Sequence, residues 1–145
     1  MKHHRSYAAY WELLVTTDRF AATKNCRLRA RNGEAFVDGA AIAFVFPKGW
    51  NTQGAIYRTG GDAPRRWRED LPEILRIGAP MDRGSVENPA QGLVWIPLRR
   101  LDGVNAIEIQ PQPGKAARIF RFHGMKGLYQ SALSQGCIPV SRTVK

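Results

Sequence analysis

The sequence has few of the features that mark secreted miniproteins, metalloproteins or membrane proteins. It contains two cysteines, Cys26 and Cys137; they are compatible with one disulfide, which their spacing does not decide and which would not make a disulfide framework. It contains three histidines and no Cys-x-x-Cys or His-Glu-x-x-His pattern, so no metal site is predicted. No apolar run approaches the roughly 20 residues of a membrane-spanning helix.

Acidic residues are also scarce. The chain has 12 Asp and Glu against 22 Lys and Arg, which gives a formal net charge of +10 and a pI near 10.3. This balance predicts attraction to a polyanion: nucleic acid, an anionic membrane surface or an anionic cell-wall polymer. No recognised nucleic-acid-binding motif accompanies the charge, which argues against nucleic acid. The basic N-terminus runs into Glu12 without a small-residue cleavage site, so no secretory signal is predicted.

Length and patterning predict one mainly β domain over residues 1–145. The chain has 145 residues, 43% of them hydrophobic, enough for one ordinary core. Short segments of β-preferring residues alternate with glycine and proline turns, among them Asn32-Gly33 and Asp38-Gly39. Residues 7–15 fit a strand or a helix equally well. The expected strands cover residues 26–30, 35–37, 40–46, 55–57, 93–98, 104–110 and 118–123. We expect a compact antiparallel or mixed β-sandwich or barrel with small helical content.

One helical insertion is predicted near residues 64–77. Its apolar side chains recur at spacings of three or four, the period of a helix face: Trp67, Leu71, Ile74 and Leu75. Its outward side would carry arginines: Arg65, Arg66, Arg68 and Arg76. Arginine neutralises phosphate and an indole can stack on a base, so Arg65 to Arg68 could bind nucleic acid. We prefer the simpler interpretation, a solvated helix face with Trp67 in the core.

The C-terminal stretch combines an imidazole and a thiol. Residues 118–123 alternate like a half-buried strand that ends at His123, and two glycines then predict a break and a short hairpin-like excursion. That excursion would return Cys137 toward His123. A thiol is mostly protonated at neutral pH and needs a nearby base to act as a nucleophile. Amides at Gly136 and Cys137 could stabilise an oxyanion. In the alternative, Cys137 is a small buried hydrophobe and His123 an ordinary strand residue.

These residues carry a family resemblance. Phe-Arg-Phe-His123 followed by Ser134-x-Gly136-Cys137-Ile138 resembles the catalytic signature of L,D-transpeptidases of the YkuD type. It is most similar to the short variant in peptidoglycan-targeting effectors of bacterial type VI secretion. Gln135 stands where the longer motif has histidine, and Pro139 where it often has arginine.

The resemblance implies a cysteine enzyme over the whole domain. Cys137 would be the nucleophile and His123 its base, while Ser134, Gln135 and Gly136 would shape the loop and the oxyanion hole. The substrate-binding candidates are Arg121 and Trp95, and residues 78–91 form a predicted lid or substrate-lining loop.

The implied activity is peptidoglycan modification through a thioacyl-enzyme on stem tetrapeptides, as an L,D-transpeptidase or carboxypeptidase, without a cofactor. The implied partners are the peptidoglycan stem peptide and an immunity or secretion-system protein. The implied site of action is the periplasm or cell envelope, after a cytoplasmic stage. Two other hypotheses remain open: a non-catalytic basic module that binds nucleic acid or an anionic wall polymer, and a structural protein of a phage or secretion particle.

Overall fold

The computed structural model describes residues 2–20, 23–77 and 92–136, and the prediction of a mainly β domain is confirmed. The N-terminal strands are β1 (Lys2–Ala8), β2 (Trp11–Asp18), β3 (Thr23–Ala30), β4 (Ala35–Asp38) and β5 (Ala41–Val45). The middle of the chain forms β6 (Ile56–Thr59), β7 (Arg65–Arg66), the 3-10 turn η1 (Trp67–Asp70), α1 (Leu71–Ile77) and β8 (Leu93–Pro97). The rest forms the 3-10 turn η3 (Leu98–Leu101), β9 (Ala106–Gln110), β10 (Arg118–Arg121) and α3 (Met125–Ser134).

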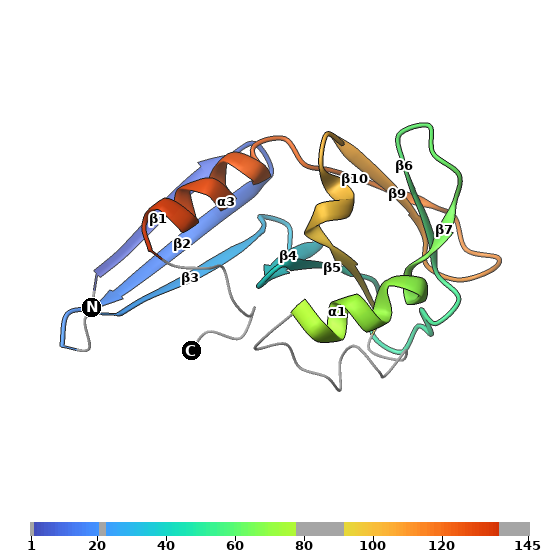
Figure 1. The fold of residues 1–145 in the computed structure, drawn as a ribbon, viewed down its shortest axis with the longest axis horizontal. Coiled ribbons are helices and arrows are strands. Elements are labelled where there is room, and N and C mark those ends of the chain that lie inside the picture. Colours follow the sequence, from blue (N-terminus) through green and yellow to red (C-terminus); the bar gives the residue numbers. More distant parts are fainter. Residues whose placement is uncertain (1, 21–22, 78–91, 137–145) are drawn as a thin grey trace.

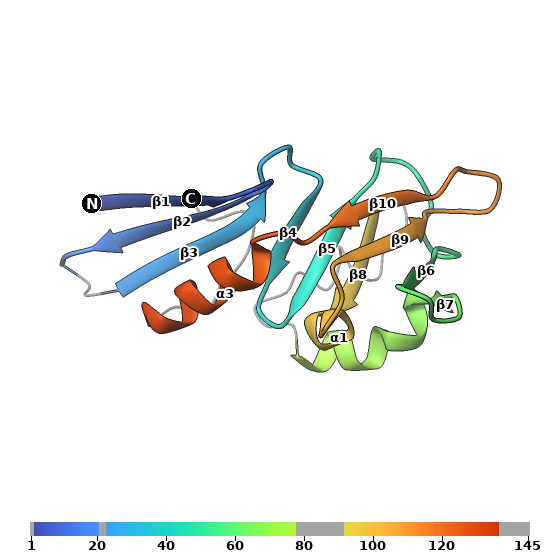
Figure 2. The same ribbon diagram turned by 90° about the horizontal axis from the view of Figure 1, so that it is seen from above.

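Six strands form one antiparallel sheet in the order β1-β2-β3-β4-β5-β8. Its two halves are joined weakly, because β3 and β4 share a single residue pair, Arg29 and Phe36. Figure 2 shows β4 turned away from the direction of β3 at this junction. The predicted turns at Asn32-Gly33 and Asp38-Gly39 lie where expected, between β3 and β4 and between β4 and β5.

The N-terminal half of this sheet, β1 to β3, carries α3 on one face (Figure 1). Alternate residues supply that face, because side chains on a strand point to opposite sides with a period of two. The buried cross-strand pairs Leu13–Leu28 and Val15–Cys26 lie on it. The helix contributes its own buried stripe, Met125, Leu128 and Ala132.

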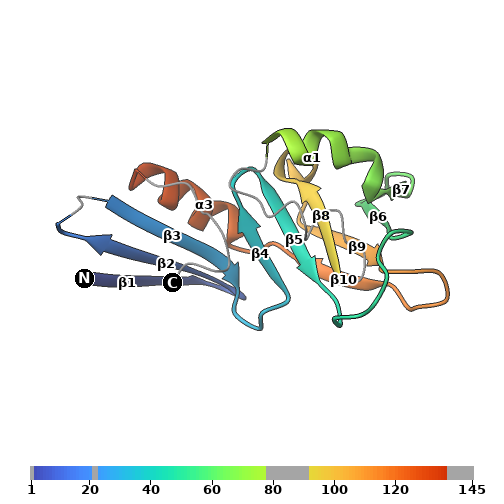
Figure 3. The same cartoon turned by 90° about the horizontal axis from the view of Figure 1, so that it is seen from below.

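The other half, β4, β5 and β8, packs against a second antiparallel sheet in the order β10-β9-β6-β7. Aromatic rings fill the space between the two sheets: Phe44 of β5 lies 4.7 Å from Phe120 of β10, centroid to centroid. Phe46 meets the same ring edge-on at 5.8 Å. This half is therefore a small β-sandwich, and Figure 3 shows α1 alongside β8, on the far side of β5 from α3.

The helical insertion near residues 64–77 is confirmed, as η1 followed directly by α1. Trp67 is buried, and its indole N–H donates to the carbonyl of Thr52 at 2.7 Å. Beside it the carboxylate of Asp70 is buried among three donors, the hydroxyl of Tyr57 and the guanidinium groups of Arg65 and Arg100. This cluster ties β6, β7, η1 and η3 together.

Candidate functional site

The expected hairpin-like excursion after His123 is wrong, because residues 125–134 form helix α3. His123 is exposed just before the helix, and Gly136 is exposed just after it. A ten-residue helix is about 15 Å long at 1.5 Å per residue. The structure therefore places the predicted base and the predicted oxyanion-hole glycine at opposite ends of α3.

The backbone and side chains expected to form the oxyanion hole close the last turn of α3 instead. The Gly136 N–H donates to the carbonyl of Leu133 at 3.0 Å. The Ser134 hydroxyl donates to the carbonyl of Ser131, and the Gln135 side-chain amide donates to the Ser131 hydroxyl at 3.1 Å. These are helix C-terminal bonds of the kind that satisfy otherwise unpaired carbonyls.

Of the two cysteines, the structure describes Cys26 and does not describe Cys137. Cys26 is fully buried on β3 and is disulfide-bonded, so it offers no free thiol. Cys137 lies outside the described residues, as do Ile138, Pro139 and the predicted lid over residues 78–91. Cysteine catalysis at Cys137 therefore stays a prediction.

The two substrate-binding candidates have opposite environments. Trp95 is fully buried on β8 and packs edge-on against Phe36 at 5.6 Å, so its prediction as a substrate contact is wrong. Arg121 is exposed on β10 and lines a groove beside Tyr10 and Trp11.

The arginine cluster around Trp67 lacks the exposed indole that the nucleic-acid hypothesis required. The indole is in the core, as the preferred interpretation expected, and cannot stack on a base. Arg65 is committed to Asp70 and Glu69. The guanidinium of Arg68 lies 5.5 Å from the Trp67 ring centre. Arg66 and, in the last turn of α1, Arg76 are exposed.

A different basic surface lies on the face of β1–β3 opposite α3. We call it the outer face of β1–β3. The register places three arginine positions of the strands on this face, Arg5, Arg27 and Arg29, together with Tyr7. Arg31 follows directly, with its guanidinium 4.7 Å from the Tyr7 ring centre, and Tyr7 remains 53% exposed.

Little negative charge opposes these arginines. Residues 1–31 contain seven Lys and Arg against two acidic residues, so they hold five of the ten net positive charges of the chain. Glu12 is buried beneath the arginines, 2.7 Å from Arg29 and 3.9 Å from Arg5. Asp18 lies at the far end of β2. In the sandwich half, by contrast, three arginines each pair with a separate carboxylate, at Arg58–Glu108, Arg99–Glu73 and Arg118–Glu34, while Arg65 and Arg100 share Asp70.

The sequence carries one signal for this surface. Arg27 and Arg29 alternate with buried residues along β3, which means that both point to one face of a sheet. Because residues 7–15 fit a helix as well as a strand, the sequence does not predict β1 and β2 as partner strands of β3. Without these two strands, the arginines of β3 have no predicted neighbours.

Within residues 2–20, 23–77 and 92–136, no group of three or more His, Cys, Asp and Glu side chains is placed to hold a metal ion. None of the helices described is long and apolar enough to cross a membrane. Comparison of the chain with protein-family models, with curated proteins and with solved structures finds no match.

Proposed function

We propose that the protein is a non-catalytic binding module for a flexible polyanion with a phosphodiester backbone. The observation that carries the proposal is the concentration of arginine around Tyr7 on the outer face of β1–β3. Among the residues that the structure describes, the strands place two carboxylates on this face, the buried Glu12 and, at the far end of β2, Asp18. Arginine pairs with phosphate through a fork of N–H donors, and several such contacts in one place supply most of the affinity for a charged polymer.

The shape of the surface suits a flexible chain. Neighbouring strands lie about 4.8 Å apart, and alternate residues of one strand about 6.8 Å apart, so the guanidinium groups form a shallow grid. A shallow grid can follow a mobile backbone that places one phosphate after another on it. Tyr7 adds a half-exposed ring on which a base could stack if the polymer were a nucleic acid.

The test compares two polymers on the same protein. A labelled single-stranded oligothymidine and a purified wall teichoic acid are titrated by fluorescence anisotropy or competition over a range of salt concentrations. Both share the phosphodiester chemistry, but only the first has bases. We expect a Tyr7→Ala variant to lose affinity for the oligonucleotide and to keep its affinity for teichoic acid if both bind through the arginines.

Paired arginine variants then test the surface itself. Arg5→Gln with Arg31→Gln removes two exposed cations from the outer face and keeps Arg29 as the partner of the buried Glu12. Since each phosphate contact contributes about 0.7 to the slope of log K against log salt on a single strand, the double variant should reduce the slope by about 1.4. Arg66→Gln with Arg76→Gln removes the same charge from exposed positions elsewhere. If the two double variants weaken binding equally, or if neither polymer binds, the proposal is wrong.

A further inference from the structure

Strand β10 is the outer strand of the second sheet, and among the described residues only one of its edges pairs with another strand. Its register with β9 places Arg118 opposite Ile109 and Phe120 opposite Ile107. The same register continues to Phe122, whose N–H donates to the carbonyl of Asn105 at 3.0 Å. In an antiparallel pair, hydrogen-bonded and non-hydrogen-bonded residues alternate. The backbone groups of Ile119 and Arg121 therefore point away from β9, toward the free edge.

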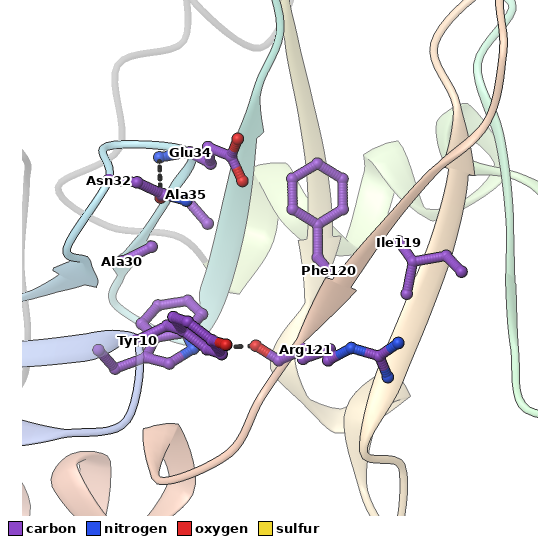
Figure 4. Close-up of a pocket in the computed structure, with 9 residues that line it drawn as sticks. Tyr10, Ala30, Asn32, Glu34, Ala35, Ile119, Phe120 and Arg121 are labelled. Carbon is purple, nitrogen blue, oxygen red and sulfur yellow. Dashed lines mark hydrogen bonds between the residues drawn. The ribbon is translucent and has the colours of Figure 1, made fainter.

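That free edge opens into a groove between the two halves of the protein. One side carries Tyr10, Asn32 and Glu34, and the other carries Ile119 and Arg121 (Figure 4). The open volume is about 220 Å³. This is less than the roughly 300 Å³ at which pockets begin to enclose a small ligand, so the groove suits a side chain or two of a longer chain.

Two contacts with the opposite wall leave the middle of the edge open. The Trp11 indole N–H binds the Arg121 carbonyl at 3.0 Å, and the Arg118 guanidinium pairs with Glu34. Among the residues that the structure describes, no hydrogen bond is recorded for the N–H and carbonyl of Ile119 or for the N–H of Arg121. An unpaired row of this kind is a template for another strand.

The side chains beside this row give it a chemical preference. Tyr10 and Ile119 are 65% and 56% exposed, which is unusual for side chains of this size. Arg121 is exposed on the same face of β10 as Ile119, and no ion pair is recorded for it in the described part of the chain. A carboxylate directly opposite Arg121 and an apolar side chain opposite Ile119 would match both positions.

We propose that the free edge of β10 binds an extended peptide segment of a partner protein, which adds to the sheet as an antiparallel strand. The segment has the pattern acid-x-apolar, with the acid opposite Arg121 and the apolar residue opposite Ile119. Main-chain hydrogen bonds supply affinity in this mode, and alternate side chains supply specificity. The site is separate from the outer face of β1–β3, so either proposal can fail without the other.

The probe is the peptide acetyl-Thr-Glu-Thr-Ile-Thr-amide, titrated into the full chain labelled with nitrogen-15. We expect the amide signals of Ile119 and Arg121 to shift and to exchange more slowly with solvent, while that of Phe120, already bonded to β9, exchanges unchanged. A peptide with Lys in place of Glu should bind at least fivefold more weakly. An Arg121→Glu variant should reverse that preference.

Backbone methylation of the peptide separates strand pairing from side-chain attraction. N-methylation of the peptide Ile removes the N–H that would donate to Ile119 and should reduce affinity about tenfold, the equivalent of one lost hydrogen bond of about 1.4 kcal/mol. N-methylation of the central Thr, whose N–H would point away from β10, is the matched control and should change little. Equal effects of the two methyl groups would overturn the proposal. So would edge amides that are protected without peptide in a concentration-dependent dimer, since that would show the edge pairing with a second copy.

Discussion

The indole N–H of Trp11 donates a hydrogen bond to the backbone carbonyl of Arg121, 3.0 Å away and 110 residues later in the chain. Trp11 begins β2 and Arg121 ends β10, so this bond joins the two sheets. It lies close to the place where β3 and β4 share a single residue pair. The Trp11 bond therefore reinforces the weakest connection in the six-stranded sheet.

Trp11→Phe should lower the free energy of unfolding by about 1–3 kcal/mol, because it removes the donor to Arg121 as well as some packing volume. Urea denaturation, monitored by circular dichroism, measures this loss in the free energy of unfolding. Trp95→Phe is the matched control: Trp95 is equally buried, and its indole N–H has no hydrogen-bond partner among the described residues. If both variants lose the same stability, the bond to Arg121 contributes nothing.

Gly124→Ala should destabilise the protein far more than Gly136→Ala. Both glycines have a φ of 84°, a left-handed conformation that costs an alanine about 1 kcal/mol. A Cβ at Gly124 would also lie 2.3 Å from the Cβ of Ala8 and 2.9 Å from its carbonyl oxygen, whereas nothing lies within 4 Å at Gly136. Overpacking of this kind adds about 1–3 kcal/mol. Thermal melts of the two variants, which share the backbone strain, isolate the clash between α3 and β1.

The sequence predicted those elements whose signals are local. The turns at Asn32-Gly33 and Asp38-Gly39 and the burial of Trp67 depend on neighbouring residues, and all three are confirmed. The helical spacing of Met125, Leu128 and Ala132 is a weak signal for α3, because Gly124 and Gly127 beside these residues also predict a break after a strand. Gly124 in fact starts the helix with a positive φ.

Contacts between distant segments had no comparable signal. The bond from Trp11 to Arg121 and the cluster around Asp70 join elements that become neighbours only when the sheets form. The candidate site shows the same limit. His123 and the residues before Cys137 match a motif in order and type, but the motif does not state that a helix lies between them. The outer face of β1–β3 required strand register, which the ambiguous residues 7–15 did not supply.

Asp70→Asn should remove part of the acid sensitivity of the fold. Burial tends to raise the pKa of Asp70, but hydrogen bonds from Arg65, Tyr57 and Arg100 outweigh it and hold the pKa below its usual value. A carboxyl with a lowered folded pKa stabilises the protein at pH values above about 4, its unfolded pKa, and loses that contribution as pH falls through the folded pKa. At pH 7 the variant should be less stable by about 3–5 kcal/mol, since two arginines lose a buried partner. Below pH 3 the difference should shrink.

Tyr57→Phe tests the alkaline side of the same cluster. Burial, followed by the hydrogen bond to Asp70, raises the pKa of Tyr57. A raised folded pKa gives stability that is present below about pH 10, the ordinary tyrosine pKa, and is lost at higher pH. The wild-type protein should therefore lose more stability than the variant between pH 9 and pH 12, as measured by urea denaturation at each pH. Parallel losses in the two proteins would show that Tyr57 is not coupled to folding.

A thiol count tests the chemistry expected from the family resemblance. Cys26 is disulfide-bonded, and the sequence contains one other cysteine, Cys137. We expect almost no reaction with a chromogenic disulfide reagent when the oxidised protein is denatured, and two thiols per chain after reduction. A nucleophilic cysteine acts as the thiolate, which only a free thiol can form. A free thiol in the oxidised protein would therefore support the enzyme hypothesis.

The same sample can then be incubated with tetrapeptide muropeptides, with and without reductant, and the products followed by mass spectrometry. We expect no trimming or exchange in either condition, because α3 separates His123 from the residues that lead to Cys137. Turnover that appears with reductant and disappears in both Cys137→Ala and His123→Ala would contradict this. It would show that the two side chains meet during the reaction although Gly136 and His123 lie at opposite ends of a ten-residue helix.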